Sequence, residues 1–81
     1  MIQTRQTDVI AHWLSNLRDR RARARIQVRI DRLQLGLPGD VKPVGKGVSE
    51  LRIDYGPGYR VYFTKRGQEL VILLTGGDKS T

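Results

Sequence analysis

The stretch from Val48 to Thr75 reads VSELRIDYGPGYRVYFTKRGQELVILLT, and its pattern decides the fold. Polar and apolar residues alternate over Glu50–Asp54 and again over Tyr59–Lys65, which is typical of strands with one buried face. A Gly-Pro-Gly sequence and then an Arg-Gly sequence interrupt this alternation. The apolar run over Leu70–Leu74 suits a strand covered on both faces. The stretch therefore predicts a three-stranded antiparallel meander.

The same alternation predicts which side chains lie together, because residues two apart share a face of a strand. If the apolar residues face one core, the open face carries two arginines, a carboxylate and a phenol: Arg52, Asp54, Arg60 and Tyr62. A turn centred on Pro57 would place Asp54 opposite Arg60, and Arg52 opposite Tyr62. We therefore expect a small sheet with a cationic surface that also bears a tyrosine.

Two helices are predicted ahead of this sheet, after a short strand within residues 1–6 that could join it. Thr7 or Asp8 can cap the first helix, whose apolar face is centred on Trp13. A second helix is expected over Arg20–Leu35, with Asp19 as its cap and a Gly-Leu-Pro sequence at its end. Four residues at helical spacing form its predicted buried stripe: Ala22, Ile26, Ile30 and Leu33.

With 81 residues, the chain is predicted to form a single domain over residues 1–81. The predicted fold class is α+β, with a short N-terminal strand, two helices and the meander. The chain has no cysteine, which excludes thiolate catalysis and sulfur-ligated metals, and it has one histidine, His12. No apolar run approaches the roughly 20 residues of a membrane helix. We expect no metal, no cofactor, no membrane association and a cytoplasmic location.

The charge balance of 15 basic and 8 acidic residues gives a net charge of +7, which points to a polyanionic partner. Nucleic acid is the leading candidate, and an acidic protein is the second. Arginines such as Arg23 and Arg25 cluster on the second predicted helix, where they could hold phosphates or simply form a solvated face. The glycine- and proline-rich segment Gly36–Gly47 reads as a connector that brings Lys42 and Lys46 near the rim of the sheet.

The segment Gly76–Thr81 reads as the exit from a strand followed by the start of a helix, with Asp78 or Ser80 as its cap. The chain stops there, so we expect a C-terminal helix to be missing.

A long part of the chain resembles a known family. The string VGKGVSELRIDYGPGYRVYF over Val44–Phe63, together with GGDKST over Gly76–Thr81, is similar to HigB-like addiction module killer proteins. These form a phage-derived, Gp49-like branch of the RelE/ParE toxin superfamily. The arginine-rich helix and the loop Leu37–Pro43 resemble the same family. The resemblance implies a strand, two helices and an antiparallel sheet, usually followed by a further helix.

The resemblance also implies a function, that of the toxin in a type II toxin–antitoxin system. In the RelE and HigB branches the activity is metal-independent cleavage of mRNA on the ribosome, so ribosome and mRNA are expected partners. The ParE branch instead inhibits DNA gyrase, and this alternative stays open, as does a module that only binds its antitoxin. The cognate antitoxin is expected to be of the helix-turn-helix type and to connect the toxin to operator DNA.

Metal-free cleavage of RNA needs an activated 2′-hydroxyl, a stabilised phosphorane and a protonated 5′-oxygen. Arginines keep their protons and therefore suit charge stabilisation, whereas a tyrosine or a lysine can move protons. Glu50 and Asp54 could act as a base or could orient the arginines. The purely structural alternative is that Arg52 and Asp54 form cross-strand pairs with Glu50 and Arg60. The predicted catalytic residues are Arg52, Arg60, Tyr62 and Lys79, and the predicted RNA contacts are Lys42, Lys46, Tyr55, Arg23 and Arg25.

Overall fold

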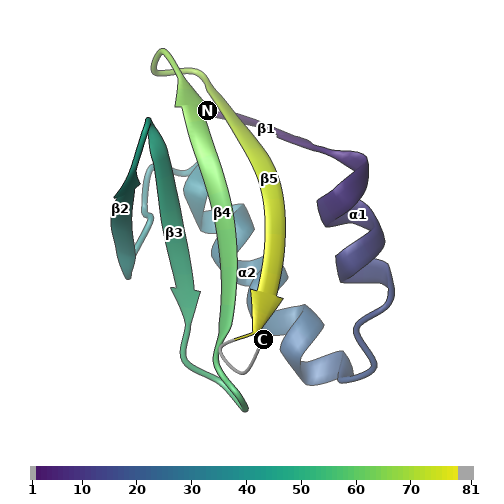
Figure 1. Cartoon of the computed structure of the whole chain (residues 1–81). Helices are drawn as coiled ribbons and strands as arrows, with labels where there is room; N and C mark the ends of the chain where they lie inside the picture. The colour runs from purple at the N-terminus through teal and green to yellow at the C-terminus, as the bar shows by residue number, and fades with distance from the viewer. Residues whose placement is uncertain (1, 79–81) are drawn as a thin grey trace.

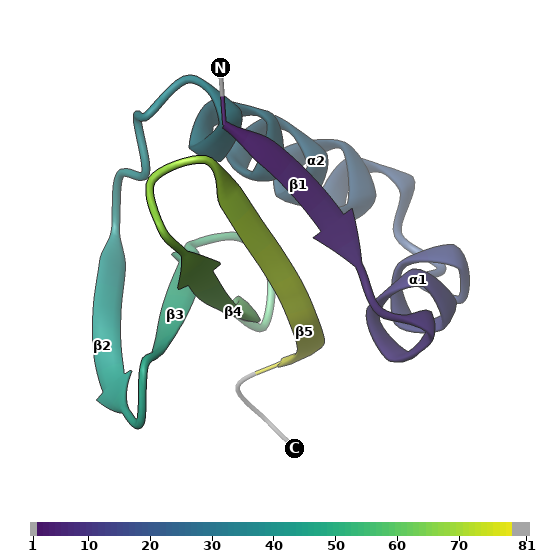
Figure 2. The ribbon, with the colours of Figure 1, turned by 90° about the horizontal axis from the view of Figure 1, so that it is seen from above.

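The computed structural model describes residues 2–78, and within them the chain forms two helices and five strands. The strands form one mixed sheet in the order β1-β5-β4-β3-β2, and both helices lie on one face of it (Figure 1, Figure 2). The predicted α+β fold is thereby confirmed. The elements are β1 (Gln3–Gln6), α1 (Asp8–Ser15), α2 (Arg20–Gln34), β2 (Val41–Gly45), β3 (Val48–Ile53), β4 (Tyr59–Arg66) and β5 (Leu70–Asp78).

Thr7 fixes the start of α1 and also ties this helix to the sheet. Its hydroxyl accepts a hydrogen bond from the amide of Ile10 at 3.2 Å and donates one to the carbonyl of Leu74 in β5 at 2.6 Å. Of the two predicted candidates, Thr7 rather than Asp8 is therefore the N-cap. One side chain sets both where the helix begins and where it sits.

Asp19 caps α2, as predicted, and the helix ends one residue earlier than expected, at Gln34. The Asp19 carboxylate accepts hydrogen bonds from the amides of Arg21 and Ala22 at 2.9 and 3.2 Å. Gly36 follows the helix with a φ of 74°, a left-handed conformation that glycine adopts without strain. The predicted buried stripe is confirmed, since none of its four residues is more than 5% exposed: Ala22, Ile26, Ile30 and Leu33.

The core lies between the helices and the sheet. The buried stripe of α2 and Ile10 of α1 contribute the helical side. Alternate residues of the central strands contribute the other side, in the phase that the sequence predicts for β3 and β4. These buried strand residues are Leu51, Ile53, Tyr59, Val61, Phe63, Val71 and Leu73.

A bulge in β5 decides how α1 docks. Tyr62 pairs with Thr75 and the next residue pairs with Leu73, which leaves Leu74 as the extra residue. Beyond the bulge, Gly76 faces α1, and a Cβ atom built there would lie 2.8 Å from Cδ2 of Trp13 and closer still to Cε3 and Cζ3. The indole ring thus covers the glycine, and only a residue without a side chain leaves room for it.

The segment Gly36–Gly47 differs from the prediction of a connector. It contains the strand β2, which pairs antiparallel with β3, so the antiparallel part of the sheet in residues 2–78 has four strands rather than three. Pro43 is tolerated because β2 is an edge strand. The proline and the glycines of this segment indicated a loop and concealed the strand.

The register between β3 and β4 is also shifted by two residues from the predicted one. Arg52 lies opposite Arg60, and Glu50 lies opposite Tyr62, so the predicted pairs Asp54–Arg60 and Arg52–Tyr62 do not form. The connection is centred one residue earlier than expected, because its two glycines turn the chain with φ angles of 56° and 86°. Two guanidinium groups therefore start from directly opposed positions.

Candidate functional site

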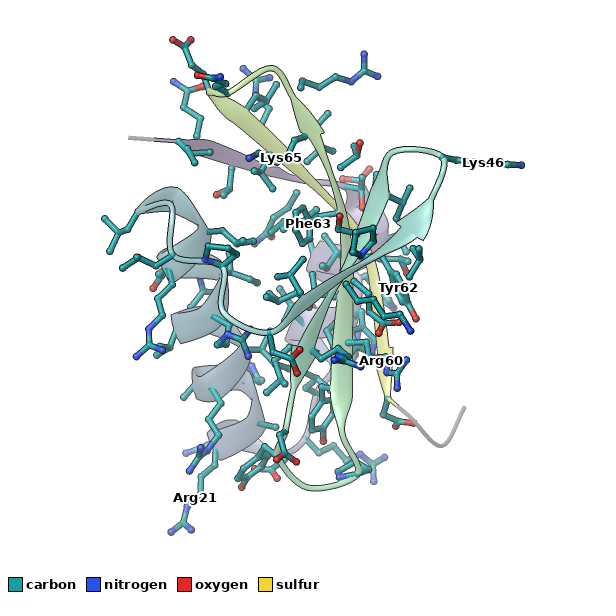
Figure 3. All side chains as sticks on the ribbon, turned by 90° about the vertical axis from the view of Figure 1, so that its left-hand side faces the viewer. Arg21, Lys46, Arg60, Tyr62, Phe63 and Lys65 are labelled. Carbon is teal, nitrogen blue, oxygen red and sulfur yellow. The ribbon has the colours of Figure 1, made fainter. Side chains whose placement is uncertain are left out.

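The face of the sheet away from the helices, which we call the open face, carries three of the four predicted catalytic side chains. Arg60 and Tyr62 of β4 point away from α2 (Figure 3). Arg52 of β3 lies opposite Arg60, and Lys42 of β2 lies opposite Glu50. Strand pairing thus brings these groups together in two neighbouring rows. The fourth predicted catalytic residue, Lys79, lies outside the described residues.

Arg52 is paired with Asp40, a residue that the sequence did not single out. Its Nε and Nη2 atoms both donate to Oδ1 of Asp40, at 3.2 and 2.9 Å. The two side chains are 42% and 53% exposed, so the pair is open to solvent. The hydrogen bond to Asp40, and next the charge of that carboxylate, raise the pKa of Arg52 above its ordinary value. The guanidinium group is therefore a permanent positive charge at the surface.

Arg60 is paired with Glu50 in a more buried setting. Its Nη1 donates to Oε2 of Glu50 at 2.9 Å. The Glu50 side chain is only 7% exposed, against 32% for Arg60. A carboxylate buried in this way is stable only with a partner, so the pair holds Arg60 in place. The structural alternative, in which Arg52 and Asp54 pair with Glu50 and Arg60, is not what forms: Arg60 pairs with Glu50, and Arg52 pairs with Asp40.

The carboxylates of Asp40 and Glu50 offset the repulsion between Arg52 and Arg60, which the register of β3 and β4 places opposite each other. Like charges directly opposite each other on neighbouring strands are destabilising. Asp40 pairs with Arg52, and Glu50 pairs with Arg60, so each arginine of the opposed pair has its own carboxylate. A hollow of about 210 Å³ lies at this end of the sheet. Its lining is Asp40, Arg52, Ile53, Asp54, Gly58, Tyr59 and Arg60.

The predicted RNA contacts do not converge on this hollow. Lys46 lies at the tip of the β2–β3 hairpin and points away from the sheet (Figure 3). Arg25 of α2 stacks on the ring of Tyr55, with its Cζ 4.8 Å from the ring centroid. Arg23 lines a separate hollow beside α1. Of the five predicted contacts, Lys42 is the one that lies on the open face beside the arginine pair.

The predicted helix start near the end of the chain falls on residues that the structure does not describe. Asp78, one of its two candidate caps, is the last residue of β5 and pairs with Tyr59 of β4. Ser80, the other candidate, lies outside the described residues.

Arg29 supports the site from the helical side, and nothing in the sequence distinguishes it from the other arginines of α2. Its Nη1 donates to the carbonyl of Arg52 at 2.6 Å, and its Nη2 donates to those of Pro38 and Asp40 at 3.0 and 3.3 Å. It thus joins α2 to the end of β3 and to the segment before β2. Asp40 could have been found from the sequence only by recognising β2 as a strand that pairs with β3.

Residues 2–78 lack both a metal-binding cluster and a membrane-spanning helix. They contain no group of three or more His, Cys, Asp or Glu side chains placed to hold a metal ion. Neither helix among them has the length and apolar character needed to cross a membrane.

These features define a class of small α+β proteins with helices on one face of a mixed sheet and paired cationic groups on the other. Comparison with known proteins identifies the family. Residues 12–81 match the family described as phage-derived protein Gp49-like (DUF891). A protein of Haemophilus influenzae, named only as uncharacterized, is 55% identical over 80 residues, which cover 99% of this chain and 81% of the relative. The chain therefore belongs to the phage-derived Gp49-like family.

Proposed function

We propose that this protein is the toxin of a type II toxin–antitoxin system and that it cleaves mRNA on the ribosome without a metal ion. Membership of the Gp49-like family supports the proposal, as does the resemblance of residues 44–63 to HigB-like killer proteins of the RelE/ParE superfamily. The observation that carries it is the placement of Arg52 and Arg60 side by side on the open face. The protein partner would be a cognate antitoxin of the helix-turn-helix type, which would link the toxin to operator DNA.

The proposed reaction is an attack by the 2′-oxygen of RNA on the adjacent phosphorus. The bond from the 2′-oxygen to phosphorus forms while the bond to the 5′-oxygen breaks, which leaves a 2′,3′-cyclic phosphate and a 5′-hydroxyl. The phosphorane between these states carries additional negative charge. Arg52 and Arg60 line one hollow and would stabilise that charge with fixed N–H donors.

The proton transfers need other groups, because an arginine does not give up its proton. One proton must leave the 2′-hydroxyl, and one must reach the departing 5′-oxygen. Tyr62 lies one row from the arginine pair and, with Lys79, would carry out these transfers. Lys42, beside Glu50 on the same face, would contact the phosphate of a flanking nucleotide.

The proposal is tested by inducing the protein and its variants in a bacterial host. We expect the wild type to arrest growth and Arg52→Ala to relieve the arrest, because loss of one donor to a charged transition state slows a reaction on the order of a hundredfold. Arg60→Lys should also weaken the toxin while it preserves a positive charge beside Glu50. Arg21→Ala removes the same charge from α2, away from the open face (Figure 3), and should stay toxic.

Two assays on purified protein decide the reaction. With ribosomes and mRNA, we expect new 5′-hydroxyl ends inside the coding sequence, and fewer of them with Arg52→Ala. Circular dichroism should show equal folding of all variants. If a folded Arg52→Ala variant is as toxic as the wild type, the assignment of Arg52 to the active site is wrong. Intact mRNA together with blocked DNA supercoiling would replace cleavage by gyrase inhibition, and no effect in either assay would leave only antitoxin binding.

A further inference from the structure

The ion pair between Arg52 and Asp40 occupies the edge of the guanidinium group that usually binds phosphate. An arginine holds a phosphate through two parallel N–H donors, and this fork is its strongest mode of binding. Here both donors of the fork, Nε and Nη2, point to a single oxygen of Asp40. The Asp40 carboxylate therefore sits where a phosphate oxygen would sit on Arg52.

In the Arg52–Asp40 pair, another anion can replace the carboxylate at little cost. In the Arg60–Glu50 pair, such a replacement is costly. The Arg52–Asp40 pair is about half exposed on both sides, and such exposed pairs contribute little to stability. Glu50, by contrast, is 7% exposed and would be left as a buried unpaired charge if Arg60 moved away. An incoming phosphate would therefore displace Asp40 from Arg52 and leave the Glu50–Arg60 pair intact.

The backbone at Asp40 can stay in place during this exchange. Its carbonyl accepts hydrogen bonds from the amide of Arg52 at 3.0 Å and from Nη2 of Arg29 at 3.3 Å. Only rotation of the side chain, which is about half exposed, is needed to free the fork. The anion also balances the two opposed arginines while no substrate is present, so the site keeps its arrangement before binding.

We infer that Asp40 is an internal competitor for the phosphate group of the substrate, which holds Arg52 in position and has to be displaced for nucleic acid to bind. This inference rests on the proposed function, because it takes the open face as the nucleic-acid site. It adds a residue that regulates affinity there. Removing the charge of Asp40 should therefore strengthen binding rather than weaken it.

The test measures binding without cleavage. The probe is a fluorescein-labelled single-stranded DNA oligonucleotide, which lacks the 2′-hydroxyl, and the readout is anisotropy with the full chain. Asp40→Asn is compared with Asp54→Asn, which removes the same charge from the same hollow. Asp54 is in neither of the two ion pairs found among residues 2–78, so it is a matched control.

We expect Asp40→Asn to bind about two- to fivefold more tightly than Asp54→Asn, which is the range that an exposed ion pair allows. In an Arg52→Ala background, Asp40→Asn should give no gain over Asp54→Asn. Equal affinities of the two single variants would overturn the inference, as would a gain that persists without Arg52. If Asp40→Asn tightens binding while no mRNA is cleaved, the proposed enzyme activity fails and the role of Asp40 stands.

Discussion

Replacing Gly76 with alanine should destabilise the protein through a single clash. The added methyl group would lie 2.8 Å from Cδ2 of Trp13 and closer to two other ring atoms, whereas packed carbon atoms rest about 3.5–4.0 Å apart. The indole ring must therefore move by roughly 1 Å or more. It also meets the ring of Tyr59 edge-on, with centroids 6.3 Å apart. A shift of Trp13 thus weakens the contact that anchors α1 on the sheet.

The expected loss of unfolding free energy follows from these contacts. Overpacking a well-filled core costs about 1–3 kcal/mol, and disturbing an aromatic pair costs about 0.5–1.5 kcal/mol. Alanine returns about 0.5–1 kcal/mol because it restricts the unfolded chain more than glycine does. The net loss is about 2 kcal/mol, out of the roughly 4–12 kcal/mol typical of a chain of this length.

The assay is urea unfolding followed by far-ultraviolet circular dichroism and by the fluorescence of Trp13, the only tryptophan of the chain. The matched control repeats Gly76→Ala in a Trp13→Leu background, where the smaller side chain leaves space for the methyl group. There the substitution should cost at least about 1 kcal/mol less, which is a coupling typical of residues in contact. An equal cost in both backgrounds, or a loss below about 0.5 kcal/mol in the first, would refute the reasoning.

Three further predictions concern the pH dependence of stability, the hydrogen bonds made by Arg29 and the N-cap of α1. Burial, and then the charges of Asp19 and Asp78, raise the pKa of Tyr59 above its ordinary value. The unfolded chain therefore loses the Tyr59 proton at a lower pH than the folded chain does. The contribution of this group to the free energy of unfolding is present below about pH 10 and should be lost as the pH rises further. Urea unfolding from pH 9 to 11 should show a shallower fall for Tyr59→Phe, and equal slopes would contradict the assignment. Arg29→Ala should lower the free energy of unfolding by about 1–3 kcal/mol, because its guanidinium group bonds three carbonyls. Thermal melts should show that Arg29→Lys recovers less than half of this loss, and full recovery would mean that the charge alone matters. Thr7→Ala should cost about 1–2 kcal/mol, and Thr7→Ser should retain most of the stability, because it keeps the hydroxyl that caps α1 and bonds β5. Equal urea midpoints for the alanine and serine variants would count against that role.

The sequence predicted the faces of the strands but not their register, for a physical reason. Alternation has a period of two, so a shift of two residues leaves every side chain on the same face. Arg52, Arg60 and Tyr62 therefore share the open face as expected, although their partners differ from the predicted ones. The register depends on how the glycines of the β3–β4 connection turn the chain, and the alternation contains no information about this.

Other features of the site arise from contacts between distant parts of the chain. Asp40 meets Arg52 because the edge strand β2 folds back on β3, and Arg29 reaches both from α2. The bulge at Leu74 lies inside an apolar run, in which no alternation exists to reveal a change of phase. Local patterns thus predicted the helices, their caps and the buried faces, whereas the ion pairs required the assembled sheet.

The parallel pairing of β1 with β5 has a consequence for the order in which the molecule is made. Gln3–Gln6 lie beside Leu70–Leu73, so β1 gains its neighbour in the sheet only after β5 has been synthesised. The same delay applies to the docking of Trp13 over Gly76. The sheet is accordingly completed only after β5 has been made, and pairing between segments so far apart is slow to form because a long loop has to close first.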